Sequence, residues 1–261
     1  MNALLDGVAW LGAFVLGIVE YIGELGMFAA SGIAHVVLPP YYPRQLGRAF
    51  MEIGYFSLPV VALTALFTGM VLALQSYTGF SRFGAESAIA SVVVLSVTRE
   101  LGPVLAGLMV SGRAGAAMAA ELGTMRVTDQ IDALSTLATE PMKYLVAPRL
   151  LAGTLALPAL VLLADIIGVL GGFLVATNKL GFSSGGYLTS TFNTLQTQDV
   201  VSGLIKAAVF GFVIALMGCF NGYRSRGGAQ GVGAATTSAV VSASILILAL
   251  DYVLTQVLFV K

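Results

Sequence analysis

Five stretches of the chain are long and apolar enough to cross a lipid bilayer, and they constrain the fold more than any other feature. A transmembrane helix needs about 20 mostly apolar residues to cross roughly 30 Å of hydrocarbon. The five stretches are 53–74, 88–110, 150–177, 200–220 and 238–260. Only 10% of the residues are charged, too few to coat a water-exposed surface, where about 25% is usual. The sequence therefore predicts an all-α integral membrane protein with five transmembrane helices.

The region before residue 44 differs from these stretches. Asp6, Glu20 and Glu24 divide it into apolar pieces of about 12 to 14 residues, each too short to cross. We expect an N-terminal helix that lies in the membrane interface, with a sixth crossing as the alternative. Three prolines between 39 and 43 predict a stiff break after it. The expected organisation is one domain, 1–261, with an N-terminal segment 1–43 and a core 53–260.

Basic residues in the loops predict the orientation of the chain. A cytoplasmic N-terminus leaves three of them on the outer side, Arg82, Lys179 and Lys261. It places a larger group on the cytoplasmic side: Arg44, Arg48, Arg113, Arg126, Lys143, Arg149, Arg224 and Arg226. The C-terminus is therefore predicted to be periplasmic.

Small residues recur at four-residue spacing in the spans, as in Gly168/Gly172 and in Gly203/Ala207/Gly211. Such stripes let helix backbones approach closely, which favours helix association in lipid. The stripes predict packing within one subunit or against a second copy, and the spacing does not distinguish the two.

Five charged residues lie within the predicted spans: Arg99, Glu100, Asp165, Lys206 and Asp251. A charge at a helix centre costs at least about 2.5 kcal/mol on insertion scales, so each should face protein or a wet cavity. Adjacent helical residues point about 100° apart, so Arg99 and Glu100 each need another partner. Lys206 and Asp251 fall at similar depth and are expected to pair. The alternatives for the set are polar groups satisfied by packing, or the lining of a central cavity, which we favour for Arg99 and Glu100.

The long cytoplasmic loop, 111–149, is predicted to contain a short amphipathic helix. Thr128 can cap it, with Asp129 favourably placed in its first turn. An apolar face of Ile131, Leu134 and Leu137 lies opposite Asp132 and Ser135, and Glu140-Pro141 should end the helix. Such a helix suits a partner's groove; the alternative is a helix lying on the lipid surface. A second short helix is predicted outside the membrane within 181–199.

Several function classes lack their motifs in this sequence. No Gly-x-x-x-x-Gly-Lys-Ser/Thr loop occurs in this sequence. The single histidine, His35, lies outside the spans, and the single cysteine, Cys219, lies in an apolar run and suggests packing. The formal net charge is zero, so no basic surface predicts nucleic-acid binding. Energy for active transport would have to come from another chain.

Several segments of the chain resemble the MlaE/YrbE permease family, the membrane subunits of bacterial phospholipid ABC transporters that work with MCE-domain proteins. The similar segments are FTGMVLALQ at 67–75, TRELGPV at 98–104, GRAG at 112–115, AELG at 120–123, FNGY at 220–223 and LDYVLT at 250–255. The resemblance runs from about residue 45 to about 259. It implies an ATP-driven permease that moves phospholipids between the inner membrane and a periplasmic carrier, maintaining outer-membrane asymmetry.

The resemblance also implies partners and residue roles. The partners are a second copy of the chain, a cytoplasmic MlaF-like ATPase dimer that binds ATP and Mg, an MlaD-like MCE hexamer, a phospholipid and a small MlaB-like STAS protein. The lipid cavity is expected to involve Leu72, Phe80, Phe83, Arg99, Glu100 and Leu101. The coupling helix that contacts the ATPase is expected to involve Asp129, Gln130, Ile131, Asp132, Leu134 and Leu137. The chain itself is expected to have no catalytic or metal site and no cofactor.

Three other functions stay open at this point. The substrate could be a sterol or a hydrocarbon instead of a phospholipid. The chain could be a passive channel or scaffold subunit. An intramembrane enzyme would have only Glu100, Asp165 and Asp251 as acid–base groups, and no motif links them.

Overall fold

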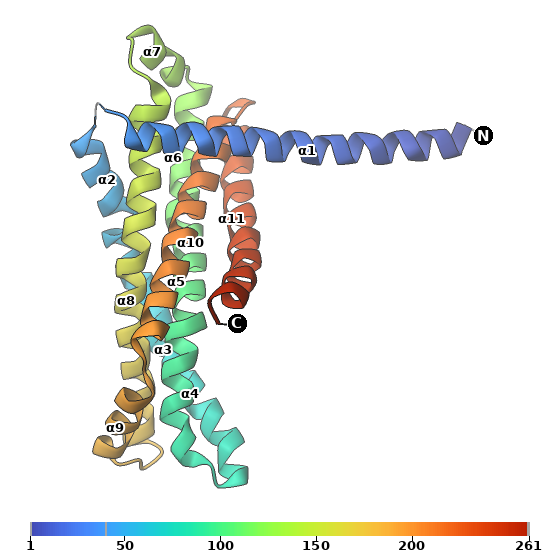
Figure 1. The fold of residues 1–261 in the computed structure, drawn as a ribbon. Coiled ribbons are helices and arrows are strands. Elements are labelled where there is room, and N and C mark those ends of the chain that lie inside the picture. The colour runs from blue at the N-terminus through green and yellow to red at the C-terminus, as the bar shows by residue number, and fades with distance from the viewer. Residues whose placement is uncertain (1, 40, 260–261) are drawn as a thin grey trace.

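The computed structural model describes residues 2–39 and 41–259, and the part of the chain that it describes is built from helices. Pro40 and the terminal residues Val260 and Lys261, which entered the expectations above, lie outside it. Figure 1 shows a tall bundle with one helix lying across one end. The bundle confirms the all-α membrane architecture, and the proposed division at residues 43 and 53 stays a prediction.

Within the described residues, six helical segments are long and apolar enough to cross a membrane. Five form the bundle, and each extends beyond the span predicted for it: Pro43–Phe83, Ile89–Val127, Met142–Asn178, Thr197–Tyr223 and Gly228–Phe259. The second has the largest difference at a single end, because it continues to Val127 instead of ending near 110. Much of the predicted cytoplasmic loop is thus a helical extension of the second span.

Several of these segments contain more than one element. The first joins α2 (Pro43–Ile53), a turn at Tyr55–Ser57, α3 (Leu58–Phe80) and a turn at Ser81–Phe83. A short turn at Glu86–Ala88 precedes the second segment. That segment joins α4 (Ile89–Ser96), a π-helical turn at Val97–Leu101, α5 (Gly102–Val110), a second π-helical turn at Ser111–Gly115 and α6 (Ala116–Val127). The third joins a π-helical turn at Met142–Val146 to α8 (Ala147–Asn178). The fourth and fifth are α10 (Thr197–Tyr223) and α11 (Gly228–Phe259).

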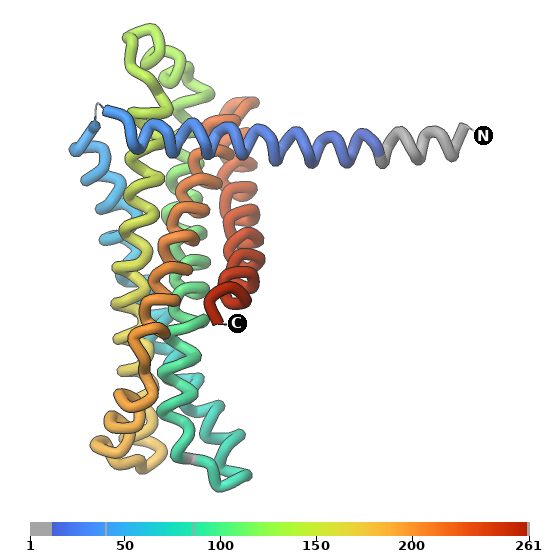
Figure 2. The backbone as a smooth tube through the Cα atoms, viewed as in Figure 1, coloured from blue at the N-terminus to red at the C-terminus, as the bar shows by residue number. Residues whose placement is uncertain are grey.

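The remaining segment belongs to α1 (Asn2–Val37), a continuous helix that Glu20 and Glu24 do not interrupt. Its stretch Gly12–Val37 is long enough to cross a membrane, so the prediction that acidic residues leave only short apolar pieces is wrong. In Figures 1 and 2, however, this helix lies across the end of the bundle and not alongside the other five. The arrangement favours the interfacial position, which stays a prediction because it depends on where the bilayer lies.

Two short helices mark opposite ends of the bundle. The helix α7 (Gln130–Thr136) follows α6 at the end where α1 lies, and α9 (Ser184–Thr194) lies at the other end, as the backbone path in Figure 2 shows. The predicted helix within 181–199 is therefore confirmed. Burial raises the pKa of Tyr187 in α9 to about 12, because its hydroxyl packs against α8.

Close backbone contact holds three of the long helices together. A Cβ atom on Gly69 of α3 would lie 1.8 Å from the carbonyl oxygen of Gly168 on α8. A Cβ atom on Gly211 of α10 would lie 2.1 Å from the carbonyl oxygen of Gly153, also on α8. Glycine is required at such positions because any side chain would collide with backbone. These parts of the small-residue stripes therefore serve packing within the subunit.

Candidate functional site

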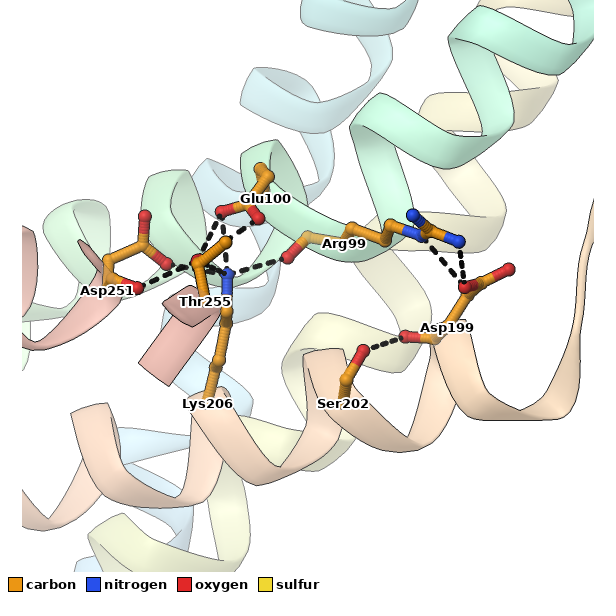
Figure 3. A network of polar contacts seen from close by, with 7 residues as sticks. All are labelled: Arg99, Glu100, Asp199, Ser202, Lys206, Asp251 and Thr255. Carbon is orange, nitrogen blue, oxygen red and sulfur yellow. Dashed lines mark hydrogen bonds and ion pairs between the residues drawn. The ribbon is translucent and has the colours of Figure 1, made fainter. Parts of the chain in front are cut away.

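A network of charged side chains joins three membrane-spanning segments (Figure 3). Arg99 and Glu100 come from the π-helical turn of the second segment, and Lys206 comes from α10. Asp251 and Thr255 come from α11. An unpaired charge in lipid is costly. The mutual pairing of these side chains explains how such apolar helices can contain charged residues.

Lys206 lies at the centre of the network, and its side chain is fully buried. Its Nζ lies 2.6 Å from Glu100 Oε2 and 2.9 Å from Asp251 Oδ1. The ammonium group also donates to Thr255 Oγ1 at 2.7 Å and to the carbonyl oxygen of Arg99 at 3.1 Å. Four acceptors thus surround a group that carries three hydrogens. The predicted pair between Lys206 and Asp251 is confirmed.

One of these acceptors, the carbonyl oxygen of Arg99, is available because of the backbone of the second segment. In a regular helix the Arg99 carbonyl would accept from the N–H of residue 103, four positions later. Pro103 has no N–H, so this carbonyl lacks its usual donor. Lys206 supplies a replacement from α10. The π-helical turn immediately precedes α5, and Pro103 lies in the first turn of that helix.

Arg99 points away from Lys206 and pairs with Asp199, at the start of α10 (Figure 3). Its Nη2 lies 2.6 Å from Asp199 Oδ1, and its guanidinium carbon lies 4.7 Å from the centre of the Phe259 ring. The other oxygen of Asp199 accepts from the backbone N–H of Gln196, which caps α10. As expected, Arg99 and Glu100 have separate partners.

Asp199 is the network residue that sequence reasoning missed. It lies in the polar stretch before the fourth span, and its only signal was an acidic residue in the first turn of a helix. With it, the network contains three acidic and two basic side chains. The exposed fractions of the Arg99 and Glu100 side chains are 35% and 38%, so both charges reach the surface of the bundle.

Asp165 does not belong to this network. It lies on α8, is 6% exposed, and its Oδ1 has no hydrogen-bond partner among the described residues. This oxygen packs directly against Gly102, where a Cβ atom would lie 2.0 Å away. Of the five charges predicted within spans, four therefore converge and the fifth is buried elsewhere.

The residues expected to line the lipid cavity have different surroundings in the part of the chain that the structure describes. Leu72 and Phe80 pack beside a buried cluster that includes Ile89 and Val93. Leu101 lines a shallow apolar groove between α3, α5 and α8. Phe83 lies in the turn after α3 with 83% of its surface exposed. Since consecutive helical residues diverge by about 100°, Leu101 faces a different side from Arg99 and Glu100. Their shared role in lipid binding stays a prediction.

The short helix expected between the second and third spans is present as α7, but its ends differ from those predicted; its role as a coupling helix stays a prediction. Asp129 precedes its first residue in a left-handed conformation with φ 57°, and the Thr128 hydroxyl instead donates to the Thr124 carbonyl. The helix ends at Thr136, and Ala138 has φ 55°. Pro141 lies at the start of the next helix, where its missing N–H costs nothing. Thr128 as cap and Glu140-Pro141 as terminator were therefore wrong.

The side chains of α7 divide into an inner and an outer set. Ile131 is buried in the main core, and Leu134 packs partly against it. Leu137 is 74% exposed, and Asp132 is exposed and pairs with Arg126 at 2.6 Å. Asp129 and Gln130 are exposed as well. Ile131 thus attaches the helix to its own bundle, while the exposed residues remain available to a partner.

Comparison with known proteins identifies the family of this chain. The family model described as Permease MlaE matches residues 46–257. The chain belongs to the MlaE permease family. This confirms the resemblance inferred from the short segments, and with the six apolar helices it makes the chain a multi-pass membrane permease of ABC type. An MlaE-type permease is the membrane subunit and not the catalytic one.

Individual relatives of this MlaE-family chain come from bacteria and a plant. A "Probable ABC transporter permease protein" of Rickettsia felis is 58% identical over 92% of this chain and 93% of its own length. The "Intermembrane phospholipid transport system permease protein MlaE" of Haemophilus influenzae is 35% identical over 98% of each chain. The chloroplastic protein TRIGALACTOSYLDIACYLGLYCEROL 1 of Arabidopsis thaliana is 41% identical over 83% of this chain and 61% of its own length.

Proposed function

We propose that this chain is the permease subunit of an ATP-driven phospholipid transporter of the bacterial inner membrane. A phospholipid is amphipathic, and a path for it needs both an apolar surface and a few polar groups. The observation that carries the proposal is the position of Arg99 and Glu100, which are partly exposed in an otherwise apolar bundle. The relative from Haemophilus influenzae, named as a phospholipid transport permease, supports the same substrate class.

Energy for transport would enter through α7. This helix protrudes at one end of the bundle, is anchored by Ile131, and presents Asp132 and Leu137 outward. We infer that a cytoplasmic ATPase dimer, which binds ATP and Mg, docks on this exposed set. The same end carries Arg126 and Arg224, consistent with a cytoplasmic location and a periplasmic C-terminus.

Further subunits would complete the transporter. On α11, an exposed apolar stripe at helical spacing contains Val241, Ile245, Leu248 and Tyr252, and it suits a second copy of the chain. We propose that an MCE hexamer at the opposite end receives the lipid and that a small STAS protein binds the ATPase. Lipid movement between the inner membrane and this carrier would maintain the asymmetry of the outer membrane.

Two single substitutions separate lipid handling from ATPase docking. Glu100→Gln keeps the shape of the side chain and removes its charge, so we expect slower lipid transfer with normal ATPase association. Asp132→Lys reverses a charge on α7, so we expect about tenfold less co-purified ATPase, equivalent to about 1.4 kcal/mol. Glu20→Lys, the same charge change on α1, serves as the control. Normal ATPase association of Asp132→Lys would contradict the role given to α7.

The alternative functions give different results in a transfer assay with reconstituted complex and labelled lipid. A passive scaffold or channel would continue to transfer lipid when ATP hydrolysis by the partner is blocked. A sterol or hydrocarbon permease would transfer those molecules and leave phospholipid in the donor membrane. Our proposal requires transfer of phospholipid that stops with hydrolysis.

A further inference from the structure

A cavity separate from the charge network lies between α1, the end of α10 and the start of α11. Its volume is about 360 Å³. It is lined by Tyr21 of α1 and by Arg224, Ser225 and Arg226 of the connection between α10 and α11. We call residues 224–228, Arg-Ser-Arg-Gly-Gly, the 224–228 loop.

The charge balance of this cavity is positive. Arg224 forms an ion pair with Glu24 of α1 and lies 5.1 Å from the centre of the Phe220 ring. Arg226 is exposed and has no ion-pair or hydrogen-bond partner for its side chain among the described residues. One guanidinium charge is therefore left over at the cavity, which attracts an anion.

The backbone adds hydrogen-bond donors to this positive charge. Gly227 and Gly228 have φ 86° and 68°, in the left-handed region that glycine tolerates, and α11 begins at Gly228. The first turn of a helix has N–H groups without intrahelical partners and carries a partial positive charge. No described side chain caps this turn, whereas Asp199 forms a capping box at the start of α10. The free donors suit a phosphate group.

Ser225 is an independent sign that a ligand belongs here. It lines the cavity and is only 5% exposed, and its Oγ has no hydrogen-bond partner among the described residues. Burial of an unpaired hydroxyl is unfavourable, so a partner is expected when the site is occupied. A phosphate oxygen in the cavity would accept from this hydroxyl after rotation of the Ser225 side chain from its position beside Gly123.

We propose that the 224–228 loop binds the phosphate group of an anionic phospholipid from the surrounding leaflet. Exposed apolar side chains lie near Tyr21 on α1, because Ile18 and Ile22 are 45% and 60% exposed. These side chains would contact acyl chains, which a free phosphate ion lacks. Basic pockets between helices at the membrane surface bind anionic headgroups in this way. The site does not depend on the proposed transport function.

Native mass spectrometry of the full chain in detergent tests the site with two probes, phosphatidylglycerol and inorganic phosphate at the same free concentration. We expect retained phosphatidylglycerol on the unmodified protein and little retained phosphate. Arg226→Gln should weaken lipid retention about tenfold, the loss typical of one charge-assisted hydrogen bond. Ser225→Ala should weaken it less. Arg44→Gln removes an exposed charge from α2, away from the cavity, and should leave retention unchanged.

Each other outcome overturns the proposal. Equal loss in Arg226→Gln and Arg44→Gln would mean that net charge, and not this loop, retains the lipid. Retention of inorganic phosphate at the level of phosphatidylglycerol would identify a site for a soluble anion. Normal lipid retention in the double variant Ser225→Ala, Arg226→Gln would exclude the loop. The Arg226 side chain is exposed and has no hydrogen bond or ion pair among the described residues, so we expect Arg226→Gln to unfold at the same temperature as the unmodified protein, which near-UV circular dichroism checks.

Discussion

Two ion pairs of the same length lie in different surroundings in this protein. Lys206 and Glu100 approach to 2.6 Å inside the bundle, where the lysine side chain is fully buried. Arg126 and Asp132 also approach to 2.6 Å, but beside α7 with 35% and 61% of their side chains exposed. In water the attraction is weakened by solvent and salt, whereas inside the bundle it is not. The N–O distance alone therefore does not show which of the two ion pairs is stronger.

The two pairs also differ in what their loss would leave behind. Breaking the exposed pair leaves each charge hydrated, so exposed pairs contribute only about 0–1 kcal/mol. Breaking the buried one strands a charge in a poorly hydrated place, which costs about 3–5 kcal/mol. The inner network thus links three membrane-spanning segments, whereas the outer pair contributes little to the position of α7.

The largest expected effect is that of Lys206→Met. Glu100 and Asp251 would lose their shared counter-charge, so we expect a loss of stability of about 3–5 kcal/mol. Thermal unfolding of the purified chain in detergent, followed by near-UV circular dichroism, measures it. The triple variant with Glu100→Gln and Asp251→Asn as well should recover most of the loss. A single variant as stable as the unmodified protein would show that the network is hydrated.

A smaller, asymmetric effect is expected at the Arg99–Asp199 pair. Arg99→Gln leaves the buried Asp199 carboxylate without its cation, at a cost of about 1–3 kcal/mol. Asp199→Asn should cost less, because asparagine still caps α10 and Arg99 is partly exposed. The same unfolding measurement compares the two. Equal losses would indicate that the cap, and not the ion pair, determines the effect.

A double-mutant cycle with Arg126→Gln and Asp132→Asn probes the exposed pair. We expect a coupling energy of about 0.2–1 kcal/mol, because solvent screens both side chains. Chemical unfolding of the two single variants and the double variant measures it. A coupling energy as large as the loss in Lys206→Met would remove the distinction between the two regions.

The smallest expected effect is that of salt. At about 1 M ionic strength the screening length falls to about 3 Å, so the Arg126–Asp132 coupling should vanish. The stability difference between the unmodified protein and Lys206→Met should persist, since ions do not reach a fully buried ammonium group. Repeating both measurements at low and high salt sharpens the comparison. A salt-sensitive Lys206 effect would place that group in contact with solvent.

Predictions from the sequence were confirmed for residues that are stable in only a few environments, such as long apolar stretches and charges within them. Long apolar stretches predicted the five bundle segments, and the cost of charge in lipid predicted partners for Arg99 and Glu100 and the pair between Lys206 and Asp251. The pairing of Asp199 with Arg99 was not predicted. An acidic residue at the start of a helix is stable in water without a partner, so nothing in the sequence indicated one. The predicted ends of α7, Thr128 and Glu140-Pro141, were wrong. They were inferred from neighbouring residues alone, whereas Ile131 of this helix packs in the main core.

The candidate lipid residues show a second limit. Leu101 follows Glu100 in the chain yet faces another side of the bundle, so a short motif contributes to two surfaces. The 224–228 loop lies between the fourth and fifth segments, and its charge appeared in the sequence only as evidence for orientation. Its cavity requires α1 to lie across the bundle, which no local pattern encodes.

The glycine contacts between α3, α8 and α10 restrict how this permease changes shape. Gly69 meets Gly168 and Gly211 meets Gly153 backbone to backbone, so neither interface can slide without a steric clash. These contacts fix the positions of the three helices relative to one another. By contrast, α11 packs on the bundle through side chains such as Ala239, Ala243 and Ile247. Movement of α11 away from these helices would break the Lys206–Asp251 ion pair and leave the glycine contacts intact.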